Sequence, residues 1–312
     1  MKFFNLTLIA VAASAALLSG CSASKSAPKS GADSATPLKV MSYNLRYTNK
    51  IDTGINKWDA RRLPSFKMLR EQMADIVGLQ EPRKDQREDL FAQMSDIYTF
   101  YDPVRDEGVS EKFSGYVPVM WLTSRFDCLD RGCFWLSPTP DVESRPGWGS
   151  TDIQPRMCVW VKLLDRKSGK PVYFFNTHLP YKTPDNDARF AATSLIVERM
   201  KQIVGEDAPV FVTGDMNTSY AETDKRRRSV QPFFDWMQSA RYTAHHVNAN
   251  PETTYSFNGF GWPKEGKPNP NWNLDHIFFR NITPLDFEVL DSERYGVKYI
   301  SDHYPITLTL TY

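Results

Sequence analysis

The chain has 312 residues, with 38 lysines and arginines against 37 aspartates and glutamates. Hydrophobic residues make up 41% and charged residues 24%, which excludes a disordered chain, a collagen and a polytopic membrane protein. The formal net charge of +1 argues against a protein that coats nucleic acid or a membrane by bulk electrostatics. It leaves open a local site for an anionic substrate.

Residues 1–20 predict an export signal. Lys2 is their single charge, an apolar run extends through Leu18, and Ser19, Gly20 and Cys21 follow. The ending Leu-Ser-Gly-Cys resembles the lipobox of bacterial lipoproteins. The resemblance implies cleavage before Cys21, lipidation of that residue, and an exported lipoprotein held to the bacterial cell envelope by its lipid. An N-terminal transmembrane anchor is the alternative, but the apolar stretch is shorter than the roughly 20 residues that a spanning helix needs.

Residues 21–37 are small and polar, which is typical of a flexible tether. We expect residues 38–312 to form one domain, because no linker divides them. Its three cysteines, Cys128, Cys133 and Cys158, cannot all pair within the chain. We favour free, partly buried thiols over a Cys128–Cys133 disulfide, since five residues of extended chain separate that pair too far.

Strands and helices alternate along this domain. In chain order, apolar and alternating patterns predict strands at 38–47, 75–81, several places within 98–136, 157–164, 171–178, 209–215, 274–279, 286–290 and 305–310. Helical spacing predicts helices at 58–73, 83–94, 187–203 and 230–240. Hairpins mixed with crossover helices favour two packed β-sheets with helices outside.

Polar side chains recur where these strands begin or end. They are Asn44, Glu81, Asn176, His178, Asp215, Asn217, Asp275, Asp302 and His303. Two pairs, Asn176 with His178 and Asp215 with Asn217, have the i,i+2 spacing that places side chains on one face of an extended chain. A single polar residue at a strand end usually forms a turn or a cap. So many sites along one chain instead indicate a binding or catalytic edge.

A series of short motifs carries a resemblance to a known family. In order they are Ser42-Tyr-Asn44, Gly78-Leu-Gln-Glu81, Asn176-Thr-His-Leu179, Gly214-Asp-Met-Asn217, Leu274-Asp275 and Ser301-Asp-His303-Tyr-Pro-Ile306. The series resembles the signature of the endonuclease/exonuclease/phosphatase superfamily, which includes DNase I and the exonuclease III-like enzymes. The resemblance extends from about residue 40 to residue 310. It implies a four-layered α/β/β/α sandwich with the site at one edge of the two sheets.

The resemblance also implies a metal site and a base. Glu81 is the principal ligand of Mg²⁺, with Mn²⁺ as an alternative ion, and Asn44 and Asp302 lie beside it. Mg²⁺ prefers oxygen ligands of this kind. Asp215 orients or deprotonates the attacking water.

Further residues are assigned to phosphate and substrate. By resemblance Asn217, His178 and His303 face the phosphate, and Asp275 orients the His303 ring. Asn176 and Arg156 are assigned to substrate binding. For Arg156 an ordinary salt bridge at the rim is an equal alternative. The basic run 225–228 is expected to be solvated surface, with a substrate or lipid-headgroup role as its alternative.

These residues predict a divalent-metal-dependent phosphoesterase that cleaves a phosphomonoester or a phosphodiester. One alternative is a 3′–5′ exonuclease or an endonuclease acting on nucleic acid, a partner that the neutral charge does not indicate. Another alternative is a catalytically inactive, lipid-anchored binding protein. The presence of Glu81, Asp215 and His303 argues against it. We expect a monomer, and the sequence leaves the substrate open.

Overall fold

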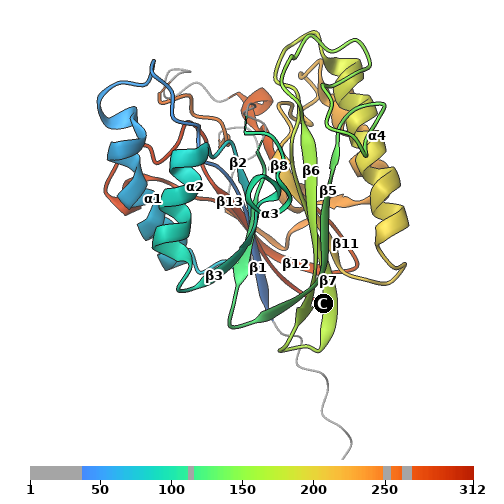
Figure 1. Cartoon of the computed structure of the whole chain (residues 1–312), viewed down its shortest axis with the longest axis horizontal. Helices are drawn as coiled ribbons and strands as arrows, with labels where there is room; N and C mark the ends of the chain where they lie inside the picture. Colours follow the sequence, from blue (N-terminus) through green and yellow to red (C-terminus); the bar gives the residue numbers. More distant parts are fainter. Residues whose placement is uncertain (1–36, 112–115, 249–253, 262–268) are drawn as a thin grey trace, which may run out of the picture. The chain divides into compact units, whose positions relative to one another are not determined.

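The computed structural model of the chain describes residues 37–111, 116–248, 254–261 and 269–312. The expected signal, Cys21 and nearly all of the tether lie outside the described residues. Two β-sheets pack face to face in the described part, and helices cover both outer faces (Figure 1). Among the helices of this part, none is both long and apolar enough to cross a membrane.

One sheet has seven strands in the order β10-β12-β13-β1-β2-β4-β3. At its centre β1 (Leu38–Asn44) pairs in parallel with β2 (Ile76–Gln80) and antiparallel with β13 (Ile306–Thr311). The others are β3 (Tyr98–Tyr101), β4 (Val119–Leu122), β10 (His246–Asn248) and β12 (Thr283–Val289). All residues of β2 are buried, because both faces of this strand are covered.

The second sheet has six strands in the order β5-β6-β7-β8-β11-β9. The expected hairpin is β6 (Met157–Asp165) with β7 (Lys170–His178), and β7 continues in parallel with β8 (Val210–Asp215). The remaining strands are β5 (Phe126–Trp135), β9 (Gln238–Ser239) and β11 (Asp275–Arg280). The two parallel pairs, β1 with β2 and β7 with β8, bring four strand ends to one edge of the sandwich.

Helices complete the outer layers. Helix α1 (Trp58–Gln72) and helix α2 (Lys84–Met94) cover the seven-stranded sheet, while α4 (Asn186–Ile203) and α5 (Gln231–Trp236) cover the six-stranded sheet (Figure 1). The short elements are α3 (Pro103–Glu107), α6 (Ala240–Thr243) and the 3-10 turns Gly54–Asn56, Arg227–Val230, Pro270–Trp272 and Glu293–Tyr295. Three apolar clusters fill the space between the sheets and beneath each helical layer. The expected α/β/β/α sandwich is therefore confirmed.

Two details differ from the sequence expectation. The helix expected at 230–240 ends at Trp236, because Met237 is extended and β9 then pairs with β11. The stretch 98–136 contains the short helix α3 as well as strands. Cys128, Cys133 and Cys158 are free thiols, and their burial ranges from exposed through half-buried to fully buried.

Gly78 allows the two sheets to approach closely, and this closeness gives a first prediction. A Cβ atom at Gly78 would overlap with Thr213 Oγ1 and Asn176 Oδ1 of the facing sheet. We expect Gly78→Ala to lower the free energy of unfolding by about 1–3 kcal/mol, the usual cost of overpacking a core. Urea denaturation would measure the loss. Gly205→Ala is the control, because a Cβ there meets nothing within 4 Å, and equal stability of the two variants would contradict the prediction.

Candidate active site

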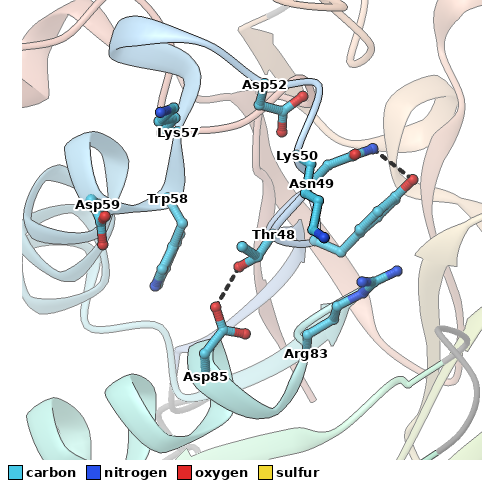
Figure 2. A pocket seen from close by; sticks show the side chains of 10 residues that line it. Thr48, Asn49, Lys50, Asp52, Lys57, Trp58, Asp59, Arg83 and Asp85 are labelled. Atoms are coloured by element: carbon cyan, nitrogen blue, oxygen red, sulfur yellow. Dashed lines mark hydrogen bonds between the residues drawn. The ribbon is translucent and has the colours of Figure 1, made fainter.

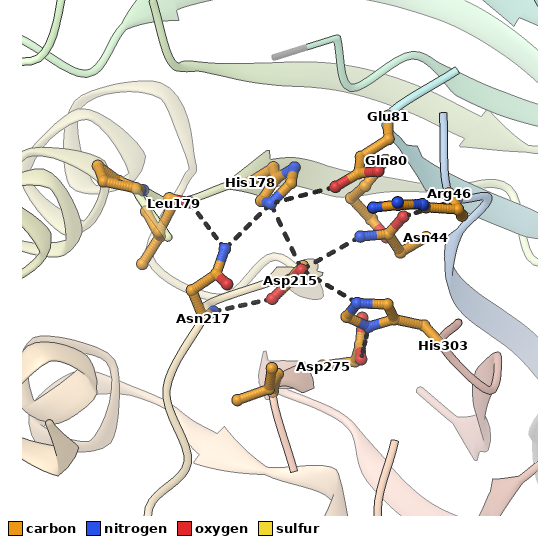
Figure 3. A network of polar contacts seen from close by, with 12 residues as sticks. Asn44, Arg46, Gln80, Glu81, His178, Leu179, Asp215, Asn217, Asp275 and His303 are labelled. Atoms are coloured by element: carbon orange, nitrogen blue, oxygen red, sulfur yellow. Dashed lines mark hydrogen bonds and ion pairs between the residues drawn. The ribbon is translucent and has the colours of Figure 1, made fainter. Parts of the chain in front are cut away.

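The polar residues predicted at strand ends meet at one edge of the sandwich (Figure 3). Asn44 and Glu81 come from the ends of β1 and β2, and His178 and Asp215 from the ends of β7 and β8. Asp275 begins β11 directly opposite Asp215, because β11 runs antiparallel to β8. Five separate strands thus place side chains at one edge, which is where open α/β sheets commonly bind ligands.

Asp215 lies at the centre of this group and is 2% exposed. Asn44 Nδ2 donates to its Oδ2 atom at 3.1 Å, and the backbone amide of Asn217 donates to its Oδ1 atom at 2.8 Å. Burial raises the pKa of Asp215 to about 7; His303 opposes the rise and Asp275 adds to it. A carboxylate with a pKa near neutrality is suited to accept a proton as a general base.

His303 is paired with Asp275. Nδ1 of His303 lies 2.7 Å from Asp275 Oδ2, and the other ring nitrogen, Nε2, lies 3.7 Å from Asp215 Oδ2. Burial by itself lowers the pKa of His303, but Asp275 and Asp215 outweigh that effect and raise the pKa to about 10. His303 is therefore a buried imidazolium at neutral pH and can donate a hydrogen bond or a proton from Nε2.

His178 is the opposite case. Burial lowers its pKa well below the ordinary value, and the charges of Arg156 and His303 lower it further. Its Nε2 atom lies 3.0 Å from Asn217 Nδ2, whose amide also donates to the carbonyl of Leu179. His178 is therefore a neutral ring at neutral pH, and its Nε2 atom also lies 3.4 Å from Asp215 Oδ2. Its Nδ1 atom is buried and has no hydrogen-bond partner among the described residues.

Glu81 and Asp302 form the acidic side of the site. Glu81 has a positive φ of 69°, and its Oε2 atom accepts a hydrogen bond from the backbone amide of Tyr47 at 3.1 Å. Burial raises the pKa of Asp302, His303 opposes that rise, and Glu81 adds to it. Carboxylate oxygens are the ligands that a hard divalent cation prefers, and the Asn44 side chain adds a neutral oxygen. These residues therefore fit the expected divalent ion.

A second group of side chains has metal-binding geometry. Ligand atoms of Asp215, Asp275 and His303 all lie within 4.8 Å of one another. A metal ligand must be deprotonated, however, and His303 holds its proton firmly through Asp275. We therefore favour Glu81 and Asp302 as the ligands that would hold the ion.

Arg46 belongs to the site, although sequence reasoning did not single it out. Its guanidinium group donates to Asp52 at 3.1 and 3.3 Å, and its Nη1 atom lies 3.5 Å from Asp302 Oδ2. The backbone of Arg46 has a φ of 58° and is held by Arg61 and Gln86, which both donate to its carbonyl. The missed signal is its i,i+2 spacing from Asn44.

The structure corrects the assignment of Asn176 to substrate binding. Asn176 is fully buried between the sheets. Its Nδ2 atom donates to the carbonyl of Leu79 at 2.7 Å, and its Oδ1 atom accepts from Gln80 and Thr213. Because these internal partners occupy the amide, the Asn176 side chain links β7 to β2 and β8 by hydrogen bonds. It thereby holds the strands that carry the site residues in place.

Arg156 forms an ion pair, and it also reaches the site. Its Nε and Nη2 atoms donate to Asp152 Oδ2 at 3.1 and 2.9 Å, and the residue is 4% exposed. The positive charge of Arg156 nevertheless lowers the pKa of His178. Within the basic run 225–228, Arg226 donates to the carbonyls of Asn217 and Asn271 and so braces the loop of the site.

The pairing of His303 with Asp275 predicts the effect of Asp275→Asn. The pKa of His303 lies above its ordinary value of 6.5, so the pairing stabilises the fold fully below pH 6.5 and stops doing so as the pH rises through about 10. We expect Asp275→Asn to lower the pKa of His303 and to flatten the loss of stability between pH 7 and 10. NMR titration of the His303 ring protons would measure this. The exposed Asp286→Asn is the control, and an unchanged titration in Asp275→Asn would contradict the prediction.

The comparisons with known proteins agree with this geometry. Residues 41–303 match the model of the Endonuclease/Exonuclease/phosphatase family. The chain belongs to this family. Its members are hydrolases that act on phosphate esters and generally use divalent metals.

Several solved structures are similar. A mannosyl-6-phosphatase of Bacteroides thetaiotaomicron is 27% identical, with a TM-score of 0.74 over 88% of this chain and 100% of that chain. A family protein of Bacteroides vulgatus is 26% identical, with a TM-score of 0.74 over 88% and 98%. D. rerio TDP2, solved with a single-strand DNA product, shares the fold at 19% identity, with a TM-score of 0.66 over 89% and 100%.

Among curated proteins, an uncharacterized protein of Acanthamoeba polyphaga mimivirus is 22% identical over 304 residues. The match covers 83% of this chain and 41% of the viral protein, so the chain spans less than half of that relative's length.

Proposed function

We propose that this protein is a Mg²⁺- or Mn²⁺-dependent phosphoesterase that hydrolyses a phosphate monoester. The observation that carries the proposal is the buried arrangement of Asp215, His303 and Asp275, in which a base with a pKa of about 7 lies beside an imidazolium. A base that ionises near neutral pH is thus held beside an acid that keeps its proton there, as hydrolysis by water requires.

In the proposed reaction Asp215 accepts the proton of the attacking water. Asn44 and the backbone amide of Asn217 hold the carboxylate in position for this step. His303 donates from Nε2 to a phosphoryl oxygen as negative charge develops, and Asp275 keeps the ring protonated and oriented. Glu81 and Asp302, with Asn44 beside them, would hold a divalent ion, which would supply Lewis-acid stabilisation of the phosphoryl charge.

For the substrate we propose a phosphorylated sugar. The mannosyl-6-phosphatase at 27% identity over nearly the whole domain supports this choice, and the neutral charge of the chain weighs against an extended nucleic-acid groove.

A panel of phosphate esters tests the proposed function. Purified protein with Mg²⁺ or Mn²⁺ would be incubated with hexose 6-phosphates, phenyl phosphate, a bis-ester of phosphate and 5′-phosphorylated DNA. We expect release of inorganic phosphate from the monoesters and its loss on chelation. Hydrolysis of the bis-ester or of DNA internal bonds alone would identify a diesterase or a nuclease. Inertness on the whole panel would favour a binding protein.

We also propose that Cys21 is lipidated after cleavage of residues 1–20 and that the lipid anchors the protein to a bacterial membrane. The lipobox-like ending Leu-Ser-Gly-Cys supports this proposal. Mass spectrometry of the mature N-terminus would detect a diacylglyceryl cysteine at position 21. Cys21→Ser should release the protein into the soluble fraction, and an unmodified Cys21 would contradict the proposal.

A further inference from the structure

A cavity of about 830 Å³ opens between the loop that follows β1 and the start of α2 (Figure 2). Tyr47 and Asn49 line one side of the cavity. Lys57 and Asp59 line a second side at the start of α1, and Arg83 and Asp85 line a third side. This volume falls in the range of pockets that enclose a small organic ligand.

The cavity and the candidate active site share a wall. The backbone amide of Tyr47 donates to Glu81, while the same residue lines the cavity. Asp52 lines the cavity as well and holds Arg46, whose guanidinium group reaches Asp302. A phosphate ester with its phosphate at the site can therefore extend its leaving group into this cavity.

The cavity is pre-formed by contacts between its own walls. Thr48 Oγ1 donates to Asp85 Oδ2 at 2.6 Å, which ties the β1–α1 loop to α2 (Figure 2). Asn49 Nδ2 donates to the hydroxyl of Tyr47 at 2.9 Å. The guanidinium of Arg83 lies 4.5 Å from the centre of the Tyr47 ring and gives that ring a fixed partner. Such pre-organisation lowers the entropic cost of binding.

The charges of the lining exclude two kinds of ligand. Three carboxylates (Asp52, Asp59 and Asp85) face three cations (Lys50, Lys57 and Arg83), so the formal charge of the wall is zero. A polyanion such as DNA would bring its phosphates close to three carboxylates, which costs free energy. An apolar leaving group would bury charged groups without partners.

Uncharged, hydroxyl-rich ligands match this wall. Lys57 and Asp59 are exposed, and within the described part of the chain neither side chain makes a hydrogen bond or an ion pair. An ammonium group donates to a sugar hydroxyl, and a carboxylate accepts from one. We infer that the cavity between Tyr47, Asp59 and Asp85 binds the sugar part of the substrate, with Lys57 and Asp59 as contacts to its hydroxyl groups. This inference rests on the proposed monoesterase function.

A matched pair of double variants tests the inference. Lys57→Ala/Asp59→Ala removes both contacts at the start of α1, and Lys67→Ala/Glu71→Ala removes one basic and one acidic side chain from α1 outside the cavity. We expect the first variant to lower kcat/KM for hexose 6-phosphates about tenfold, the effect of losing one or two hydrogen bonds. Its kcat/KM for phenyl phosphate, which lacks hydroxyl groups, should stay at the wild-type value, and the Lys67/Glu71 variant should match wild type on both substrates.

The outcomes separate the inference from the function on which it rests. Suppose that wild type cleaves phenyl phosphate and hexose phosphates. If kcat/KM of the Lys57/Asp59 variant then falls equally for both substrates, or for neither, the sugar assignment is wrong while the phosphoesterase function stands. Faster cleavage of phosphorylated DNA than of hexose phosphates would overturn the sugar assignment and would indicate a nucleic-acid substrate. Saturation-transfer NMR with a neutral mannose disaccharide reports on the cavity without turnover. Signal that is lost in the cavity variant supports the inference even if no ester is cleaved, and no signal with wild type overturns it.

Discussion

Asp215→Asn should lower kcat for phosphate-ester hydrolysis by about a thousandfold, within the usual range for removing a general base. The amide keeps the size of the carboxylate, and its oxygen can still accept one of the two hydrogen bonds, from Asn44 Nδ2 or from the backbone amide of Asn217. The other hydrogen bond is lost, because the amide nitrogen is a donor. The substitution removes the group whose pKa of about 7 allows it to accept the proton of the attacking water. Steady-state kinetics at saturating metal ion would measure the effect, with circular dichroism to check the fold.

The same residue predicts a pH dependence. Because the pKa of Asp215 is raised to about 7, its reactive, ionised form should increase as the pH rises through neutrality, and kcat/KM of wild type should rise with it. The residual activity of Asp215→Asn should lack this rise. An acidic limb that persists unchanged in the variant would assign the titration to another group.

A buried carboxylate remote from the site provides the control. Asp165 is fully buried, pairs with Arg125 and accepts from Tyr312, and lies at the far end of β6 from Met157. Breaking a buried pair typically costs about 3–5 kcal/mol of folding free energy. Asp165→Asn should therefore melt at a lower temperature than wild type while the folded protein keeps its kcat. A thousandfold loss of kcat in this control would show that destabilisation alone explains the result at Asp215.

Glu81→Gln should weaken Mg²⁺ binding by at least about a hundredfold, since even outer partners of metal ligands contribute 10–100-fold. The glutamine can still accept the hydrogen bond from the Tyr47 amide, so the positive-φ turn at residue 81 is retained. The loss then reports the missing negative charge. Calorimetric titration of the ion, together with the metal concentration that gives half-maximal activity, would measure it.

This prediction also distinguishes the two groups of possible ligands. If the ion is held by Glu81 and Asp302, Asp275→Asn changes its affinity far less than Glu81→Gln. The reverse order would place the ion among Asp215, Asp275 and His303, whose ligand atoms lie within 4.8 Å of one another. Glu71→Gln, an exposed carboxylate on α1, should bind the ion like wild type and controls for net charge.

The sequence by itself predicted the positions of most strands along the chain and most of the residues at the site. Strand ends are recognisable because apolar runs stop at polar residues, and parallel pairs such as β1 with β2 must then place Asn44 and Glu81 at the same edge. Asp215 and Asn217 do lie together, but through a turn and not through one face of a strand: Asn217 follows β8 with a φ of 51°, and its backbone amide donates to Asp215 Oδ1. The strand pattern together with the family resemblance therefore sufficed for the sandwich and for the location of its site.

The tertiary structure alone decided what each residue can do there. Asn176 and His178 have the same i,i+2 spacing, yet Asn176 is enclosed by Leu79, Gln80 and Thr213 while His178 faces Asp215. Sequence spacing specifies the face of a strand but not what packs against that face. The short helix α5 is a similar case, because pairing with β11 overrides the local helical pattern.

Protonation states follow the same rule. Asp215 and His303 are 88 positions apart, so their raised pKa values arise only when folding buries both beside Asp275. The sugar-binding cavity likewise needs the loop after β1 and the start of α2 to face each other. Sequence specified the chemical groups, whereas burial and charges from distant positions set their pKa values and their partners, because electrostatic interactions depend on distance in space and on access of water.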